Sequence, residues 1–242
     1  MSADYILEVE NLDVHYGDFQ AIFDLSMSFE RGRIISIIGA NGAGKSTLLN
    51  SIMGLHKRTG GKIIFEGRDI SSMPTSKIVG QGITMSPEGS MIFESMSVRE
   101  NLLMGAYLPQ AKAKKNELLE KVFTLFPVLK EKSGQLATFL SGGQRQMLAL
   151  SRAIMTDPKV IICDEVSLGL APIIIKDIYD KIKDINAGGM TVVLVEQEVK
   201  RSLRYSDFSY VIVKGKVVME GPSSGLVFDE VQDAYFGINK YA

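Results

Sequence analysis

Apolar and polar residues alternate over residues 5–10, 12–16 and 25–30. A period of two is the spacing of a half-buried strand, so these segments predict two strands, a turn and a third strand. Residues 34–38 are apolar except for one serine, and such a short continuous run predicts a strand buried on both faces. The amino-terminal part of the chain is therefore expected to be rich in β-structure.

Further elements follow from the same patterns. Apolar residues at helical spacing after the glycine-rich segment that follows residue 38 predict a helix that begins near Lys45 and stops at Gly54. The strands on both sides of this helix are expected to be antiparallel and peripheral to the main sheet. Residues 60–70 are expected to form a turn, a short strand and a second turn. Later strands are expected at 82–85, 160–165 and 191–195, with a hairpin over 211–221 that turns near Lys214 and Gly215.

The composition and periodicity of the sequence change between residue 88 and about residue 140, where glycines become rare and helical periodicity appears. One apolar helix face carries Leu118, Leu119, Val122, Phe123 and Phe126, opposite lysines and glutamates. We therefore predict an α/β fold of one domain. Its core, with the antiparallel β subdomain, comprises residues 1–87 and 141–242, and residues 88–140 form an inserted helical subdomain.

Residues 39–46 match the phosphate-binding pattern G-x-x-x-x-G-K-[ST] between a predicted strand and a predicted helix, which is the context that the pattern needs. Glycines allow successive N–H groups to turn towards a phosphate, and the helix adds its positive dipole end. Lys45 is expected to contact the β- and γ-phosphates and Ser46 to bind Mg²⁺. The alternative is a plain glycine-rich turn, which the full motif disfavours. The nucleotide-binding candidates of this segment are Gly39, Asn41, Gly42, Ala43, Gly44, Lys45, Ser46 and Thr47.

Two adjacent carboxylates, Asp164 and Glu165, end the apolar strand at 160–165. Such a placement is costly unless a cation or a reaction uses the charges. Downstream of a phosphate loop, Asp164 is the candidate Mg²⁺ anchor and Glu165 the candidate general base. Two roles are open for Tyr16: surface packing at the end of a strand, or stacking on an adenine ring. Ser141 is a candidate N-cap of the next helix.

The composition excludes several classes of protein. The chain of 242 residues has 27 Lys and Arg against 28 Asp and Glu, so no net field favours nucleic acid. No apolar run approaches the ~18 residues of a membrane span, and the acidic amino-terminal residues do not resemble a signal peptide. A single cysteine, Cys163, fits a reducing cytoplasm, and the only histidines, His15 and His56, offer no zinc cluster.

Taken together, GANGAGKST, LSGGQRQ about a hundred residues later and VIICDE resemble the ATPase subunits of ABC transporters over essentially the whole chain. The resemblance implies a P-loop NTPase core, ATP and Mg²⁺ as ligands, and Tyr16 stacked on adenine. It also implies that two such domains dimerise head to tail, so that Ser141 and Gly143 of one subunit contact the γ-phosphate held by Lys45 of the other. The signature segment adds Gly142 and Gln144 to the nucleotide-binding candidates.

Three positions depart from the general ABC pattern. Glu88 stands where a glutamine usually meets metal and water, which makes it a candidate metal ligand and catalytic residue. Gln197 replaces the expected histidine and can still hydrogen-bond the γ-phosphate. Ala171 replaces an acidic residue and is the third of these positions.

With Glu88, Gln197 and Ala171, the chain resembles the subgroup that serves branched-chain amino acid importers, in which two different ATPase subunits pair beneath two permeases. Val166 is unusual even in that subgroup, because proline usually stands at this position. The resemblance implies a peripheral protein on the inner face of the cell membrane. Its expected partners are a second ABC ATPase subunit, two membrane permeases and an upstream solute-binding protein, without nucleic acid. Residues 91–96 either pack the helical insertion against the core or contact a permease.

Three functions remain open on the sequence. The first is an importer ATPase, for branched-chain amino acids or for urea, amides or polar amino acids. The second is a regulatory subunit with weak hydrolysis in a mixed dimer, which Gln197 and Ala171 motivate. The third is a soluble ABC ATPase that acts on ribosomes or DNA, which the neutral charge disfavours.

Overall fold

The computed structural model describes residues 4–236. Its internal contacts divide the chain into two compact units, one formed by residues up to Ile78 and from Thr191 onwards, the other by Val79–Met190. The expected subdivision at residues 88 and 140 is not tested by this division and stays a prediction.

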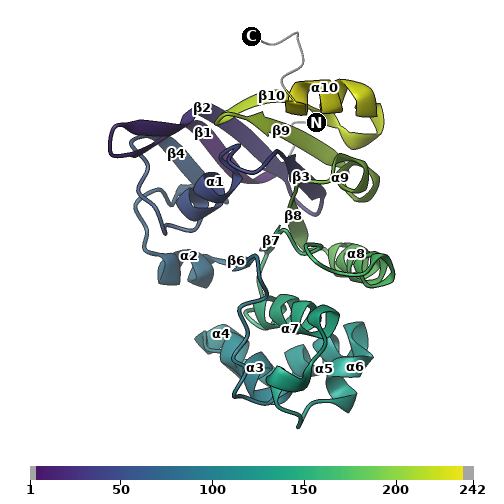
Figure 1. The fold of residues 1–242 in the computed structure, drawn as a ribbon. Coiled ribbons are helices and arrows are strands. Elements are labelled where there is room, and N and C mark those ends of the chain that lie inside the picture. The colour runs from purple at the N-terminus through teal and green to yellow at the C-terminus, as the bar shows by residue number, and fades with distance from the viewer. Residues whose placement is uncertain (1–3, 237–242) are drawn as a thin grey trace. The chain divides into compact units, whose positions relative to one another are not determined.

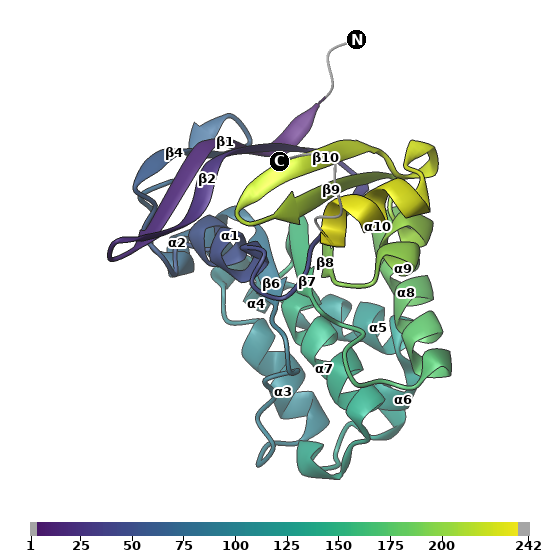
Figure 2. The ribbon, with the colours of Figure 1, turned by 45° about the horizontal axis from the view of Figure 1, so that its top comes forward.

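The first unit combines two sheets with short helices (Figures 1 and 2). Helix α2 (Thr75–Gln81) runs across its boundary with the second unit. The other elements of the first unit are β1 (Tyr5–Tyr16), β2 (Phe19–Glu30), β3 (Ile34–Ile38), α1 (Lys45–Ile52), β4 (Gly60–Phe65), β5 (Arg68–Asp69), β8 (Thr191–Glu196), α9 (Val199–Tyr205), β9 (Phe208–Val213), β10 (Lys216–Pro222), the 3₁₀ turn η2 (Ser223–Gly225) and α10 (Phe228–Phe236).

The antiparallel sheet has the strand order β2-β1-β4-β5, which confirms the expected antiparallel strands on both sides of the first helix. The prediction of two separate strands at 5–10 and 12–16 was wrong, because β1 is one strand with a bulge. The bulge lies at Asn11, whose φ is 47° and whose backbone N–H donates to Ser26 Oγ at 2.9 Å. The extra residue shifts the register between Val9 and Leu12 and so interrupts the alternation of the sequence.

In the second sheet of this unit, β3 lies between β8 and β9 and is parallel to both, and β10 continues the sheet beyond β9. All five residues of β3 and all six of β8 are buried, as expected of central parallel strands. The predicted hairpin is confirmed: Lys214 and Gly215 have φ of 48° and 77°, the two positive values of a type I′ turn. Helices α9 and α10 pack beside β9, where Val231 joins the core (Figure 2).

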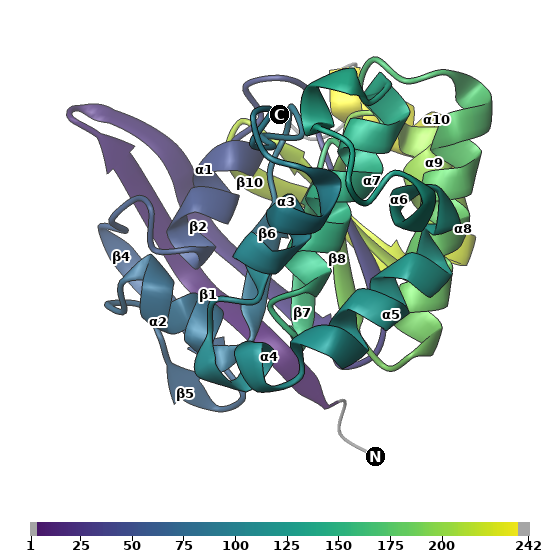
Figure 3. The same ribbon diagram turned by 90° about the horizontal axis from the view of Figure 1, so that it is seen from below.

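The second unit contains two parallel strands and a group of helices (Figure 3). Its elements are β6 (Ile83–Ser86), α3 (Val98–Gly105), α4 (Pro109–Ala113), α5 (Lys115–Leu125), α6 (Pro127–Glu131), the 3₁₀ turn η1 (Ala137–Phe139), α7 (Gly142–Ile154), β7 (Val160–Asp164) and α8 (Pro172–Ala187).

Helix α7 is the centre of this unit, since α3, α5, α6 and α8 all contact it (Figure 3). The predicted apolar face of α5 is buried as expected, and Pro127 begins a new helix directly after α5 ends. At Gly105, the last residue of α3, an added Cβ would collide with the backbone oxygen of Arg152. The close approach of α3 to α7 therefore requires glycine at this position.

Candidate functional site

The phosphate loop joins β3 to α1 in the first unit. Gly42 and Gly44 have φ of 79° and 108°, a region that L side chains rarely adopt, and Gly44 is the N-cap that lets α1 begin at Lys45. An added Cβ at Gly39 would lie 2.7 Å from the carbonyl oxygen of Ile212. The glycines of the motif are thus required by backbone conformation and by close packing.

Lys45 is held against the loop that precedes it. Its side chain is buried, and its Nζ donates to the carbonyl oxygens of Gly39 at 2.8 Å and Ala40 at 3.2 Å. Ser46, at the next position, is exposed. The loop therefore has a fixed ammonium group beside an accessible hydroxyl at the amino end of α1, where the helix dipole favours an anion.

Backbone hydrogen bonds from distant segments support the loop. Gly215 in the β9–β10 turn donates to the Ala43 carbonyl at 2.8 Å. Gly39 donates to the Glu196 carbonyl at 3.4 Å, and Ile38 is paired with Glu196 in the sheet. Gln197 follows Glu196 and is half-buried, so it lies at the same end of the parallel strands as the phosphate loop.

Tyr16 ends β1 and remains 46% exposed. Its ring stacks on the ring of His56, with centroids 4.2 Å apart and planes inclined by 29°, and its hydroxyl lies 3.4 Å from Thr47 Oγ1. Since Thr47 belongs to α1, the first helix after the phosphate loop, the tyrosine ring is held near the predicted nucleotide site.

His56 is a site residue that sequence reasoning missed. It follows α1 in a segment without regular structure, and its Nε2 lies 3.2 Å from the backbone oxygen of His15. No local motif marks it, because its contact with Tyr16 depends on how β1 and the end of α1 come together. The two histidines are therefore part of the support of Tyr16.

The second unit gathers the predicted acidic residues. Ser86 and Cys163 are paired in the parallel strands β6 and β7, so Asp164, the last residue of β7, and Glu88, two residues after β6, lie at the same end of these strands. Glu88 is exposed and Asp164 is half-buried. The arrangement provides carboxylate oxygens, the hard ligands that Mg²⁺ prefers.

Glu165 is 9% exposed and has a φ of 46°, an uncommon conformation for a non-glycine residue. It lines a pocket of about 360 Å³ together with Ser90 and Gln146. The Ser90 hydroxyl donates to Gln146 Oε1 at 2.7 Å, while Gln146 Nε2 is buried without an acceptor among the described residues. Gln146 is a second residue that sequence reasoning missed, although it belongs to LSGGQRQ.

The predicted N-cap of α7 is confirmed as a capping box. The Ser141 hydroxyl accepts from the Gln144 N–H at 3.4 Å, and Gln144 Oε1 accepts from the Ser141 N–H at 3.1 Å. Gly143 is buried against α8, since an added Cβ would lie 2.5 Å from Ile174 Cγ2. Ser141 and Gly142 are exposed at the end of the helix.

The candidates therefore form two sets. Tyr16, the phosphate loop and Gln197 lie in the first unit, and Glu88, Ser141 to Gln144, Asp164 and Glu165 lie in the second. Within residues 4–236, no three His, Cys, Asp or Glu side chains form a metal cluster of their own. Over the same range, no helix has the length and apolar character needed to cross a bilayer. The catalytic, nucleotide-binding and metal-binding roles of the individual residues stay predictions.

Comparison with known proteins identifies the family. The ABC transporter family matches residues 22–167. The chain is 41% identical over 233 residues to the high-affinity branched-chain amino acid transport ATP-binding protein BraG of Pseudomonas aeruginosa, which covers 96% of this chain and 100% of BraG. It is 31% identical to the lipopolysaccharide export system ATP-binding protein LptB of Haemophilus influenzae, over 96% of this chain and 97% of LptB.

The fold agrees with these relatives. The crystal structure of the ADP conformation of an ATP-binding cassette of an ABC transporter superposes with a TM-score of 0.81 at 32% identity, covering 97% of this chain and 96% of that cassette. This likeness extends over both units of the chain and includes a nucleotide-bound relative. The chain belongs to the ABC transporter family, as an ATP-binding subunit that hydrolyses ATP to drive transport.

Proposed function

We propose that this chain powers the import of branched-chain amino acids. The observation that carries the proposal is the 41% identity to BraG over the full length of that protein. The family alone leaves the solute open, because LptB, named for lipopolysaccharide export, is 31% identical over nearly the same span. The replacements Glu88, Gln197 and Ala171 support the importer subgroup that the sequence resembles.

In the proposed mechanism, the phosphates of ATP bind at the amino end of α1. Lys45 contributes a buried ammonium, and backbone N–H groups around Gly42 and Gly44 contribute further donors. Gln197 donates a hydrogen bond to the γ-phosphate from the end of β8. These groups stabilise the charge that spreads over the transferred phosphoryl group.

The residues proposed for Mg²⁺ fit a hard cation, because they offer a hydroxyl and carboxylates. Ser46 would hold the ion together with Asp164 and Glu88, and the bound ion would neutralise charge on the phosphate oxygens. Glu165 accepts the proton of the attacking water. Its burial and its strained backbone support a positioned general base.

Two copies of such a domain would pair head to tail. The capping box leaves the Ser141 side chain exposed at the amino end of α7, where N–H groups attract an anion. In the proposed dimer, Ser141, Gly142, Gly143 and Gln144 approach the γ-phosphate bound by the other subunit. The second subunit of the working pair is a different ABC ATPase.

The permease partners are proposed to dock on residues 91–96 of the second unit. Met91 and Phe93 are 66% and 44% exposed, and the guanidinium of Arg152 lies 5.0 Å from the centre of the Phe93 ring. An exposed apolar strip held by an arginine is typical of a contact surface. The chain then works as a peripheral protein on the cytoplasmic face of the inner membrane, with an upstream solute-binding protein.

The nucleotide contact of Tyr16 can be tested by fluorescence titration with an ATP analogue. Tyr16→Ala is expected to weaken binding roughly 5- to 150-fold, since base–aromatic stacking contributes ~1–3 kcal/mol. His56→Ala removes only the ring behind Tyr16, so a smaller loss is expected. Tyr16→Phe keeps the ring and serves as the control. Equal affinity of Tyr16→Ala and Tyr16→Phe would contradict adenine stacking.

The proposed solute can be tested by uptake in a host strain that lacks this chain. Uptake of radiolabelled leucine is expected to fall to background and to return with the wild-type chain but not with Glu165→Gln. Phosphate uptake is the control and should be unchanged. Normal leucine uptake combined with loss of urea or amide uptake, or of lipopolysaccharide export, would show that this ATPase subunit serves the transport of another solute.

A further inference from the structure

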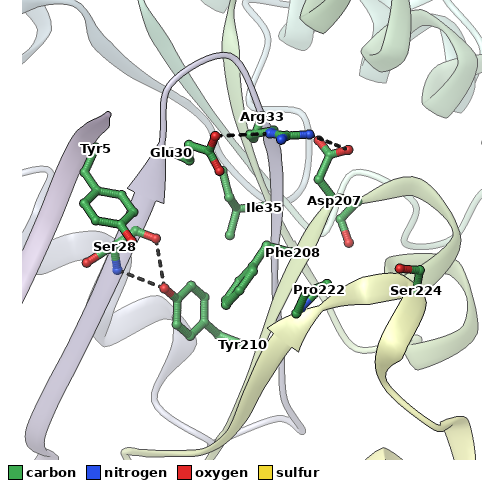
Figure 4. Close-up of a pocket in the computed structure, with 11 residues that line it drawn as sticks. Tyr5, Ser28, Glu30, Arg33, Ile35, Asp207, Phe208, Tyr210, Pro222 and Ser224 are labelled. Carbon is green, nitrogen blue, oxygen red and sulfur yellow. Dashed lines mark hydrogen bonds and ion pairs between the residues drawn. The ribbon is translucent and has the colours of Figure 1, made fainter. Parts of the chain in front are cut away.

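A second pocket lies at the opposite end of β3 from the phosphate loop. It has a volume of about 450 Å³ and is lined by the end of β2, the beginnings of β3 and β9, and the end of β10 (Figure 4). Arg33 directly precedes β3 and Ile35 lies near the start of the strand, whereas the loop follows Ile38. A strand of this length separates the two places by roughly 15 Å, so this pocket is distinct from the nucleotide site.

Three charges of alternating sign line one side of the pocket. Figure 4 shows the Arg33 guanidinium between the carboxylates of Glu30 and Asp207. The two ion pairs are long, at 3.5 Å and 3.8 Å, whereas charge-assisted hydrogen bonds are typically ~2.7–2.9 Å. The guanidinium has five N–H donors, so Arg33 keeps the capacity to bind a further carboxylate.

The floor of the pocket is apolar and aromatic. Ile35 and Tyr210 are buried, and the rings of Phe208 and Tyr210 lie 5.1 Å apart. The Tyr210 hydroxyl is bonded to the backbone N–H and carbonyl of Ser28, both at 2.9 Å. Burial raises the pKa of Tyr210 to about 12, so the phenol stays neutral and adds no charge to the floor.

We propose that this pocket binds a free α-amino acid with an apolar side chain. The ligand carboxylate meets Arg33, its ammonium group meets Glu30 or Asp207, and its side chain covers Phe208 and Tyr210. A simple anion would face two carboxylates and a simple cation would face the guanidinium, so a zwitterion fits the alternating charges best. The pocket volume lies within the range of small-molecule sites.

The binding itself does not rest on the proposed function. If the transported solute is a branched-chain amino acid, the same ligand accumulates on the cytoplasmic side, and the pocket would sense the product of import. If the solute is another compound, binding of amino acids to the isolated chain is unaffected. The two proposals therefore fail separately.

Isothermal titration calorimetry of the full chain with L-leucine tests the proposal. Leucine is expected to bind, with at least about tenfold weaker binding of glycine, of leucinamide and of 4-methylvalerate, which lack the side chain, the carboxylate and the ammonium group respectively. Absence of leucine binding up to millimolar concentrations, or binding of the three analogues as tight as that of leucine, would overturn it.

The variants Arg33→Gln and Arg31→Gln provide a matched pair. Arg31 also pairs with two carboxylates, Asp4 at 3.0 Å and Glu66 at 3.2 Å, but does not line the pocket. Leucine affinity is expected to fall at least about tenfold in Arg33→Gln and to stay unchanged in Arg31→Gln. ATP binding by both variants verifies that they are folded. Unchanged leucine affinity in a folded Arg33→Gln variant would place the ligand elsewhere and refute the assignment.

Discussion

The Glu165→Gln variant is expected to hydrolyse ATP about 100-fold or more slowly than the wild-type chain while binding ATP with similar affinity. The amide has nearly the shape of the carboxylate but cannot accept a proton from the attacking water. Glu165 is buried directly after β7 with a φ of 46°, so no other side chain is expected to take over its position. Phosphate release and nucleotide titration measure the two quantities separately.

Glu120→Gln is the control for this variant. Glu120 lies in α5 and pairs with Lys130 at 3.1 Å on the surface, where both side chains are largely exposed. Surface pairs of this kind contribute ~0–1 kcal/mol, so activity should stay near the wild-type value. Wild-type turnover in Glu165→Gln would remove the proposed general base. If turnover depended only on the partner subunit's glutamate, the chain would be a regulatory subunit.

The parts of the fold that the sequence predicted are those whose patterns are local. The phosphate-loop strand and its helix were placed correctly because a short apolar run, glycines at required conformations and helical spacing are adjacent in the chain. The hairpin at Lys214 and Gly215 was predicted from its turn for the same reason. A helix cap is equally local, and Ser141 was identified from its position before α7.

The features that the sequence analysis misjudged or missed depend on contacts between residues that are far apart in the sequence. The division of β1 into two strands resulted from the bulge at Asn11, which depends on a hydrogen bond to Ser26 in the neighbouring strand. His56 and Gln146 join the candidate site through tertiary contacts, with Tyr16 and Ser90 respectively. A spacing rule along the chain cannot indicate such contacts, because each partner lies at least forty residues away.

The assignment of the two sets of site residues to one site also has no local basis in the sequence. Lys45 and Glu165 were assigned to one reaction because their motifs resemble those of a family, and not because a local pattern joins them. The family itself is now identified by sequence and fold. Variants such as Glu165→Gln and Lys45→Ala therefore test the individual roles.

The Lys45→Ala variant is expected to lose ATP binding by about 100-fold, since a hydrogen bond to a charged group is worth up to ~3 kcal/mol. Its ammonium is already held beside the loop by the carbonyls of Gly39 and Ala40. Little reorganisation is therefore needed when a triphosphate binds. Hydrolysis should fall with binding, which distinguishes this variant from Glu165→Gln.

Thermal unfolding provides the second measurement for Lys45→Ala. A ligand that binds only the folded state stabilises it in proportion to the logarithm of its concentration over its Kd. Mg-ATP should therefore raise the Tm of the wild-type chain and of the control Lys130→Ala, whose side chain is exposed on α6, but not that of Lys45→Ala. An equal rise of Tm in Lys45→Ala would mean that the backbone N–H groups of the loop bind the phosphates without the lysine.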